Sequence, residues 1–247
     1  WLKDDDDSSA RCTLGVVPFA AETCNECACC GYLKRPEAMA FNPAARRQNL
    51  SKESRVAQAS ALRREGNILF KKGLLVNAED EYSKAIELLE FPAFQGGDRS
   101  RSGDDDENKL LALCLSNRAI CVLNMAEGKG VLDDGSPFIS QFQDKAFLAQ
   151  FRRQALEQAE EAAKRACEIS ADEKSMFRLG LAKMYIAKIG SGEYPSNESR
   201  VDLMKDAGRC FASSLRSSHT ANAESRLEEV RSWLDQYGVN SLYPDYV

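Results

Sequence analysis

Residues 61–73 read Ala-Leu-Arg-Arg-Glu-Gly-Asn-Ile-Leu-Phe-Lys-Lys-Gly, and this stretch decides the fold. Its residue types favour helix, its apolar positions recur three and four apart, and the final glycine is a common helix stop. The next predicted helix, over 75–89, carries small and large residues about one turn apart: Ala78, Tyr82 and Ala85. The small residues Gly66 and Ala78 allow the two helices to approach closely, while Tyr82 and Ala85 can interlock with the neighbouring helix. The pattern therefore predicts an antiparallel helix pair.

The same helical character continues over residues 51–238, which are rich in Ala, Leu, Glu, Lys and Arg and show no alternating strand pattern. We expect helices over 54–72, 75–89, 108–126, 140–169, 173–189, 199–217 and 220–237. Stretches with Gly and Pro separate them. The breaks near 127–140 and 190–198 are long enough to be insertions, and 239–247 is a C-terminal tail. These features predict an all-α domain.

The later helix pairs share the features of the first. The second pair has Ala119 followed by Ala159, Ala163 and Ala166, and the third has Gly180 followed by Ala207, Phe211 and Ser214. These residues and spacings resemble the tetratricopeptide repeat (TPR). The resemblance covers about residues 55–237 and implies a right-handed solenoid of three helix pairs, with the helix over 220–237 as its cap. The alternative is an unrelated bundle of amphipathic helices.

Polar residues in the first helix of each pair narrow the resemblance. Gly66-Asn67, Ser116-Asn117-Arg118 and Lys174-x-x-x-Arg178 resemble the carboxylate-clamp branch of the family. That branch includes co-chaperones that hold the extreme C-termini of heat-shock chaperones of the seventy- and ninety-kilodalton classes. Carried over position by position, the clamp residues are Arg63, Asn67, Asn117, Lys174 and Arg178. The family more often has Lys at the position of Arg63, a change that keeps the charge.

The same residues make physical sense as an anion receptor. Arg63 and Asn67 are four residues apart on one helix face, as are Lys174 and Arg178. Three cations and two amides would converge on a pair of carboxylates, such as a chain terminus ending in Asp. Because peptide ordering opposes binding, we expect micromolar affinity, about 8 kcal/mol. Phe70, Ile120 and Leu123 lie about one turn further on as candidate contacts for the penultimate peptide side chain, with repeat core as the alternative.

Composition excludes several other functions. Lys plus Arg total 33 and Asp plus Glu total 38, so a formal net charge of −5 disfavours general nucleic-acid binding. The longest apolar stretch, near 13–21, is far shorter than the roughly twenty residues that span a bilayer. The single histidine, His219, lies in a polar run, so we interpret it as a solvated loop residue. We expect no catalytic residue.

The N-terminal residues 1–50 form an irregular, Cys-rich segment with no sustained helical period. Cys24, Cys27, Cys29 and Cys30 could hold a structural zinc ion, because four thiolates satisfy its tetrahedral preference. Disulfides, free thiols and a lipidated cysteine patch are the alternatives. A thiol oxidoreductase is disfavoured, because no βαβ pattern follows Cys24-x-x-Cys27. We expect no other cofactor.

The expected function is that of a co-chaperone or adaptor, a binding module that docks the acidic C-terminal tail of a heat-shock chaperone. The alternative is a structural TPR subunit of a large multiprotein assembly, its groove filled by a neighbouring subunit. Four cysteines, Cys114, Cys121, Cys167 and Cys210, lie in helices among apolar residues, as small core residues do in a reducing compartment. We expect a cytoplasmic location. An organelle stays open, since the sequence starts at Trp1.

Overall fold

The computed structural model describes residues 50–90, 105–189, 196–218 and 220–239. The chain divides into two units, Trp1–Gln48 and Asn49–Val247, and all the described residues belong to the second unit. The Cys-rich segment with its candidate zinc ligands, His219, most of the stretch 190–198 and the C-terminal tail therefore lie outside the described residues.

The described residues form seven α-helices and one short 3₁₀ turn and contain no strand. The helices are α3 (Lys52–Lys71), α4 (Leu75–Glu90), α5 (Asp105–Ala126), α6 (Lys145–Ile169), α7 (Glu173–Ile189), α8 (Asn197–Ser217) and α9 (Ala221–Gln236), with η2 (Phe138–Gln141) before α6. The all-α prediction is confirmed. The main difference is at α6, expected from residue 140, because η2 occupies the first residues of that range.

Local sequence explains where the helices begin and end. Ser51 and Asp144 cap α3 and α6 by accepting hydrogen bonds from the amides of Ser54 at 3.2 Å and Ala146 at 2.8 Å. The C-terminus of α3 closes through Gly73, whose φ of 79° is a conformation that glycine adopts without strain. This closure reverses the chain into α4.

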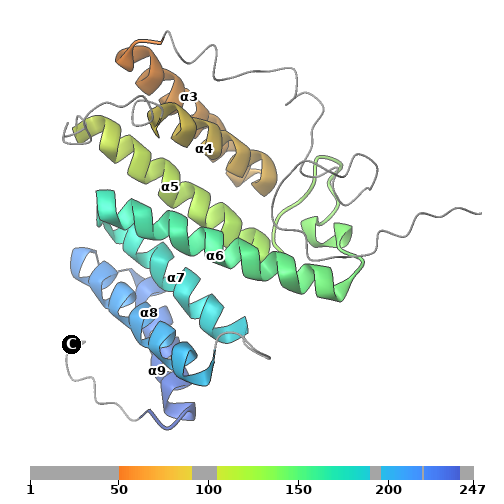
Figure 1. Cartoon of the computed structure of the whole chain (residues 1–247), viewed down its shortest axis with the longest axis vertical. Helices are drawn as coiled ribbons and strands as arrows, with labels where there is room; N and C mark the ends of the chain where they lie inside the picture. The colour runs from red at the N-terminus through yellow and green to blue at the C-terminus, as the bar shows by residue number, and fades with distance from the viewer. Residues whose placement is uncertain (1–49, 91–104, 190–195, 219, 240–247) are drawn as a thin grey trace, which may run out of the picture. The chain divides into compact units, whose positions relative to one another are not determined.

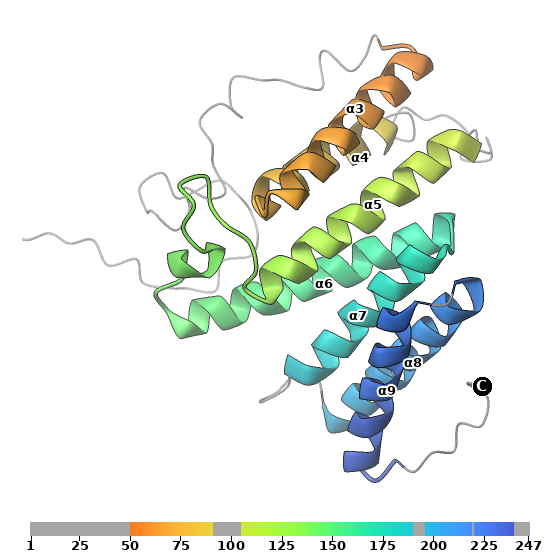
Figure 2. The ribbon, with the colours of Figure 1, turned by 180° about the vertical axis from the view of Figure 1, so that it is seen from behind.

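The helices pack as three antiparallel pairs, α3 with α4, α5 with α6 and α7 with α8, and α9 packs on α8. They stack in chain order along the domain (Figure 1). Seen from behind, α3, α5 and α7, the first helices of the three pairs, lie next to one another (Figure 2). This is the expected solenoid with a C-terminal capping helix, and it brings the first helices together as one layer.

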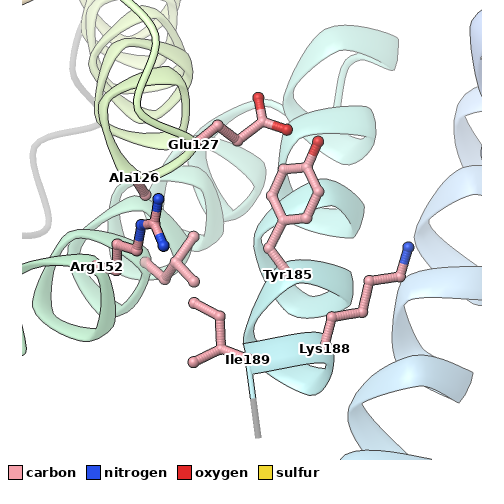
Figure 3. Close-up of a pocket in the computed structure, with 7 residues that line it drawn as sticks. Ala126, Glu127, Arg152, Tyr185, Lys188 and Ile189 are labelled. Atoms are coloured by element: carbon pink, nitrogen blue, oxygen red, sulfur yellow. The ribbon is translucent and has the colours of Figure 1, made fainter. Parts of the chain in front are cut away.

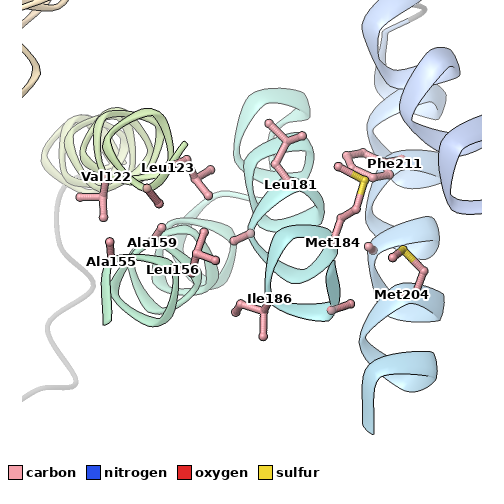
Figure 4. Packing of buried hydrophobic residues seen from close by; sticks show 14 of the residues in the cluster. Val122, Leu123, Ala155, Leu156, Ala159, Leu181, Met184, Ile186, Met204 and Phe211 are labelled. Atoms are coloured by element: carbon pink, nitrogen blue, oxygen red, sulfur yellow. The ribbon is translucent and has the colours of Figure 1, made fainter. Parts of the chain in front are cut away.

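The largest hydrophobic cluster draws its buried side chains from each helix from α5 to α9, together with Leu75 of α4 and Phe138. Its buried side chains include Val122, Leu123, Leu156, Leu181, Met184, Met204 and Phe211 (Figure 4). Close helix contacts depend on glycine. A Cβ added to Gly66 would lie 2.7 Å from Tyr82 Cε1, and one added to Gly180 would lie 2.7 Å from Phe211 Cε1. The close helix approach predicted at Gly66 is therefore confirmed, with the ring of Tyr82 as the contact, and Gly180 with Phe211 repeats it in the third pair.

Among the described helices, α5 is the one that is long and apolar enough to cross a membrane by length and composition. Of its most apolar window, 56% is buried inside the fold. Because α5 packs against α4, α6 and α7, its apolar character is explained by its place at the centre of the helical stack.

Candidate functional site

The two asparagines of the predicted clamp are in direct contact across the first two helix pairs. Asn117 on α5 donates from Nδ2 to Asn67 Oδ1 on α3 at 3.1 Å. The hydroxyl of Tyr82 on α4 donates to the same oxygen at 2.7 Å. Tyr82 is 1% exposed, so its hydroxyl needs a partner inside the fold, and Asn67 supplies it. One amide oxygen thus joins α3, α4 and α5.

Arg178 extends this contact to the third helix pair. Its Nη1 donates to Asn117 Oδ1 at 3.0 Å and to Ser116 Oγ at 2.6 Å. The chain of hydrogen bonds therefore runs from Tyr82 through Asn67 and Asn117 to Arg178 and Ser116. We call these five residues the polar cluster.

The hydrogen bonds fix how each amide is turned. A guanidinium can only donate, so Asn117 must present its oxygen to Arg178 and its nitrogen to Asn67. Asn67 in turn must present its oxygen to Asn117, and its Nδ2 has no partner among the described residues. Both amide oxygens are used inside the cluster. Asn67, Asn117 and Arg178 can therefore offer a ligand only N–H groups, which are hydrogen-bond donors.

Arg63 and Lys174 flank the polar cluster on the same helices. Arg63 lies one turn before Asn67, is partly buried, and its Nε is enclosed without a hydrogen-bond partner in the described structure. Burial raises the pKa of the Tyr82 hydroxyl well above its ordinary value. The positive charges of Arg178 and Arg63 act on the same hydroxyl and oppose this rise only in part. Lys174 lies one turn before Arg178, is exposed, and forms no hydrogen bond with another described residue. The structure thus links Asn67, Asn117 and Arg178 directly and leaves Lys174 outside their contacts.

The cations of the site lack anionic partners in the described part of the chain. Arg63, Lys174 and Arg178 take part in no ion pair there, whereas Arg118, next to Asn117, pairs with Glu79 at 2.6 Å. Burial lowers the pKa of Arg178, against the attraction of Asp172. Asp172 itself accepts a hydrogen bond from the amide of Ser175 at the start of α7, at 2.7 Å. A partly buried guanidinium with no ion-pair partner in the described part of the chain is costly, so this site favours an incoming negative charge.

The three apolar candidates differ in what they can offer. Leu123 is 1% exposed and belongs to the main hydrophobic cluster, so it lies in the core of the repeats and has almost no surface to offer a peptide. Phe70 and Ile120 are partly buried against the same cluster and keep exposed surface. Sequence reasoning singled out Tyr82 for packing and Ser116 only as part of a motif. Their hydroxyl groups, which must find partners when buried, were the signal for their place in the cluster.

Among the described residues, no group of three or more His, Cys, Asp or Glu side chains could hold a metal ion. The four helix cysteines are free. Burial raises the pKa of Cys114 to about 12 and that of Cys210 to about 11. These thiols stay protonated at neutral pH and behave as core residues.

A shallow hollow lies between the C-terminal ends of α5 and α7 and the α6 helix (Figure 3). It is lined by Ala126, Glu127, Arg152, Leu156, Tyr185, Lys188 and Ile189. Burial raises the pKa of Glu127, but hydrogen bonds with Lys129 and Tyr185 outweigh this and lower it overall. Lys188 forms an ion pair with Glu229. The hollow therefore offers mainly apolar surface, with most of its charges satisfied inside the fold.

A solved structure with a similar fold is the C-terminal TPR-containing domain of an FK506-binding protein from Plasmodium falciparum. The two share 15% sequence identity with a TM-score of 0.52, and the match covers 78% of this chain and 99% of that domain. No protein-family model and no curated protein sequence matches the chain. At this identity the likeness shows the fold, a helical solenoid of TPR type. Such solenoids present concave surfaces to protein partners.

Proposed function

We propose that this chain is a protein–protein interaction module that binds the acidic C-terminal tail of a heat-shock chaperone. The binding site is a carboxylate clamp made of Arg63, Asn67, Asn117, Lys174 and Arg178, and the module has no catalytic role of its own. The observation that carries the proposal is the polar cluster, whose amide oxygens accept hydrogen bonds inside the cluster and whose partly buried cation, Arg178, forms no ion pair among the described residues.

A terminal carboxylate group suits this arrangement better than an isolated acidic side chain. A chain ending in Asp offers two carboxylates a few ångströms apart, enough to engage donors on more than one helix at once. Asn67 and Asn117 would orient the ligand through neutral donors, while Arg178 adds charge-assisted hydrogen bonds of about 1.5–3 kcal/mol each before desolvation. Arg63 and Lys174 would contribute charge from the first and third pairs.

The first test is a fluorescence-anisotropy titration with a short peptide that ends in Glu-Glu-Val-Asp, alongside the same peptide with an amidated C-terminus. We expect micromolar binding of the free acid and none of the amide, with affinity falling as salt screens the charges. Binding that ignores amidation, or no binding, refutes the clamp. That result would favour the alternative, a structural subunit whose groove is occupied by a neighbouring protein.

Asn67→Asp is the sharpest variant, because Asn67 acts inside the cluster only as an acceptor. The aspartate keeps an oxygen for Tyr82 and Asn117 but replaces the outward Nδ2 donor with a second oxygen. We expect at least tenfold weaker peptide binding with an unchanged circular dichroism spectrum. Unchanged affinity would show that the free face of Asn67 does not meet the ligand.

Lys174 allows a matched charge control. Lys174 and Lys164 are both exposed helix lysines without an ion pair in the described structure, and Lys164 lies on α6, outside the site. Lys174→Ala should weaken peptide binding severalfold, while Lys164→Ala removes the same charge and should leave affinity within twofold. Equal effects of the two variants would mean that the chain attracts the peptide only through its overall charge.

A further inference from the structure

The connection between α5 and α6, residues 127–144, is long for a repeat protein, yet it is a folded segment. Val131 and Pro137 form an isolated antiparallel bridge. Inside this bridge the amide of Leu132 donates to the carbonyl of Ser136 at 2.8 Å. The amide of Phe138 donates back to the carbonyl of Gly130 at 3.0 Å. Its own backbone hydrogen bonds therefore give the segment a defined shape.

One side of the segment is attached to the turn between α3 and α4. The amide of Val131 donates to the carbonyl of Gly73 at 2.9 Å, and Asn77 Nδ2 donates to Asp133 Oδ1 at 2.9 Å. Gly130 lies so close that a Cβ there would be 2.8 Å from Leu75 Cδ1 and 3.1 Å from the Gly73 carbonyl oxygen. These contacts join the segment to the first helix pair.

The other side is anchored in the second helix pair. Phe138 is 1% exposed and belongs to the main hydrophobic cluster. Its ring lies 5.5 Å from that of Phe142 and 5.6 Å from that of Phe151 on α6, measured between centroids. Because one end is held in this core, the contacts with Gly73, Leu75 and Asn77 restrain the first pair relative to the second.

This restraint acts close to the candidate site. Asn67 lies on α3, about 9 Å of helix axis before Gly73, and Asn117 lies on α5, about 13 Å before its end. Their 3.1 Å hydrogen bond requires the two helix pairs to keep one relative placement. We propose that the segment 127–144 is a positioning element that locks the first helix pair onto the second and so preorganises the Asn67–Asn117 part of the clamp. The inference rests on the proposed function for its effect on binding.

Two glycines of the segment provide a matched experiment. Gly130 and Gly135 have φ values of 98° and 80°, so alanine strains the backbone at both positions. A Cβ at Gly135 meets nothing within 4 Å, whereas one at Gly130 collides with the first helix pair. Gly130→Ala should therefore loosen the attachment, and Gly135→Ala reports the cost of backbone strain alone.

The measurement is hydrogen–deuterium exchange of the whole chain followed by mass spectrometry, with peptide titration in parallel. We expect Gly130→Ala to raise exchange in α3 and α4 about tenfold, with α8 and α9 unchanged, and to weaken peptide binding three- to tenfold relative to Gly135→Ala. If both variants exchange alike in α3 and α4, the segment does not hold the first pair. If exchange rises but affinity matches Gly135→Ala, the positioning role is wrong.

The hydrogen bond between Asn77 and Asp133 offers a rescue test. Asn77→Asp places a carboxylate against Asp133 and should loosen the same attachment, while adding Asp133→Asn restores a donor–acceptor pair with reversed roles. We expect the double variant to recover the exchange rate and affinity of the native chain, and failure to recover either one overturns the inference. If the native chain binds no peptide, the proposed function fails, whereas the exchange data still decide whether the segment holds the first pair.

Discussion

Gly66→Ala tests whether the packing of the first helix pair depends on a missing side chain. The new Cβ would lie 2.7 Å from Tyr82 Cε1 and 3.0 Å from Cδ1 and Cζ of the same ring. Tyr82 is 1% exposed, so the ring cannot move aside without displacing its neighbours. Its hydroxyl would also leave its 2.7 Å hydrogen bond with Asn67.

The magnitude follows from three opposing contributions. Overpacking of a buried contact costs about 1–3 kcal/mol. Loss of the hydrogen bond between Tyr82 and Asn67 costs about 1 kcal/mol more. Alanine in place of glycine in a helix returns about 1 kcal/mol. We therefore expect Gly66→Ala to lower the free energy of unfolding by about 1–3 kcal/mol.

Gly208→Ala is the control, since Gly208 is also a buried helical glycine. A Cβ there would lie 3.3 Å from Val230 Cγ1 and 3.9 Å from Leu227 Cδ1, contacts that small side-chain shifts can relieve. The helix propensity gain should dominate, so we expect stability unchanged or raised by up to about 1 kcal/mol.

Urea unfolding followed by circular dichroism of the full chain measures both variants against the native protein. The slope of the transition must stay constant for midpoints to be compared, because repeat proteins can lose cooperativity. Opposite shifts of the two midpoints support the packing argument. A Gly66→Ala protein as stable as Gly208→Ala would refute it, because the tyrosine ring would then not be fixed against α3.

Three further results follow from the described structure. Phe138→Ala should lower the free energy of unfolding by about 3–5 kcal/mol, measured by urea unfolding, because its ring is 1% exposed. Burial raises the pKa of Glu127 and Glu229, but hydrogen bonds outweigh this and lower both pKa values overall. The partners are Lys129 and Tyr185 for Glu127, and Lys188 and Arg226 for Glu229. The stabilisation from these two carboxylates is therefore present above the unfolded pKa of about 4.5 and lost as pH falls through the lowered folded pKa, which unfolding curves from pH 7 to 3 should show. In native-state iodoacetamide labelling mapped by mass spectrometry, half-buried Cys167 should react before fully buried Cys114.

The helices were predictable because their signal is local. Apolar residues three and four apart define each helix, and capping residues and glycines set their ends within a few residues of the observed bounds. The start of α6 was expected at residue 140, whereas Asp144 caps the helix and α6 begins at Lys145. Residues 138–141 instead form a 3₁₀ turn whose Phe138 is held by the core. Irregular backbone of this kind depends on contacts that no local pattern encodes.

The candidate site divides in the same way. The family resemblance supplied all five clamp residues, and the i, i+4 spacing placed Arg63 with Asn67 and Lys174 with Arg178 on single helix faces. The partners of the supporting hydroxyl groups were not predictable, because the hydroxyl of Ser116 meets Arg178 across 62 positions of sequence. Nor was the role of residues 127–144, whose contacts with Gly73 and Asn77 depend on the arrangement of two helix pairs.

The orientation of the two amides links fold and function. Tyr82 fills the space left by Gly66, and its buried hydroxyl demands an acceptor, so Asn67 turns its oxygen inward. Asn117 must then donate to that oxygen and accept from Arg178, so neither amide can rotate without breaking a hydrogen bond inside the cluster. An anion arriving at the site meets donors already facing it and has less reorganisation to impose. The packing of the first helix pair therefore determines which atoms the site offers to its ligand.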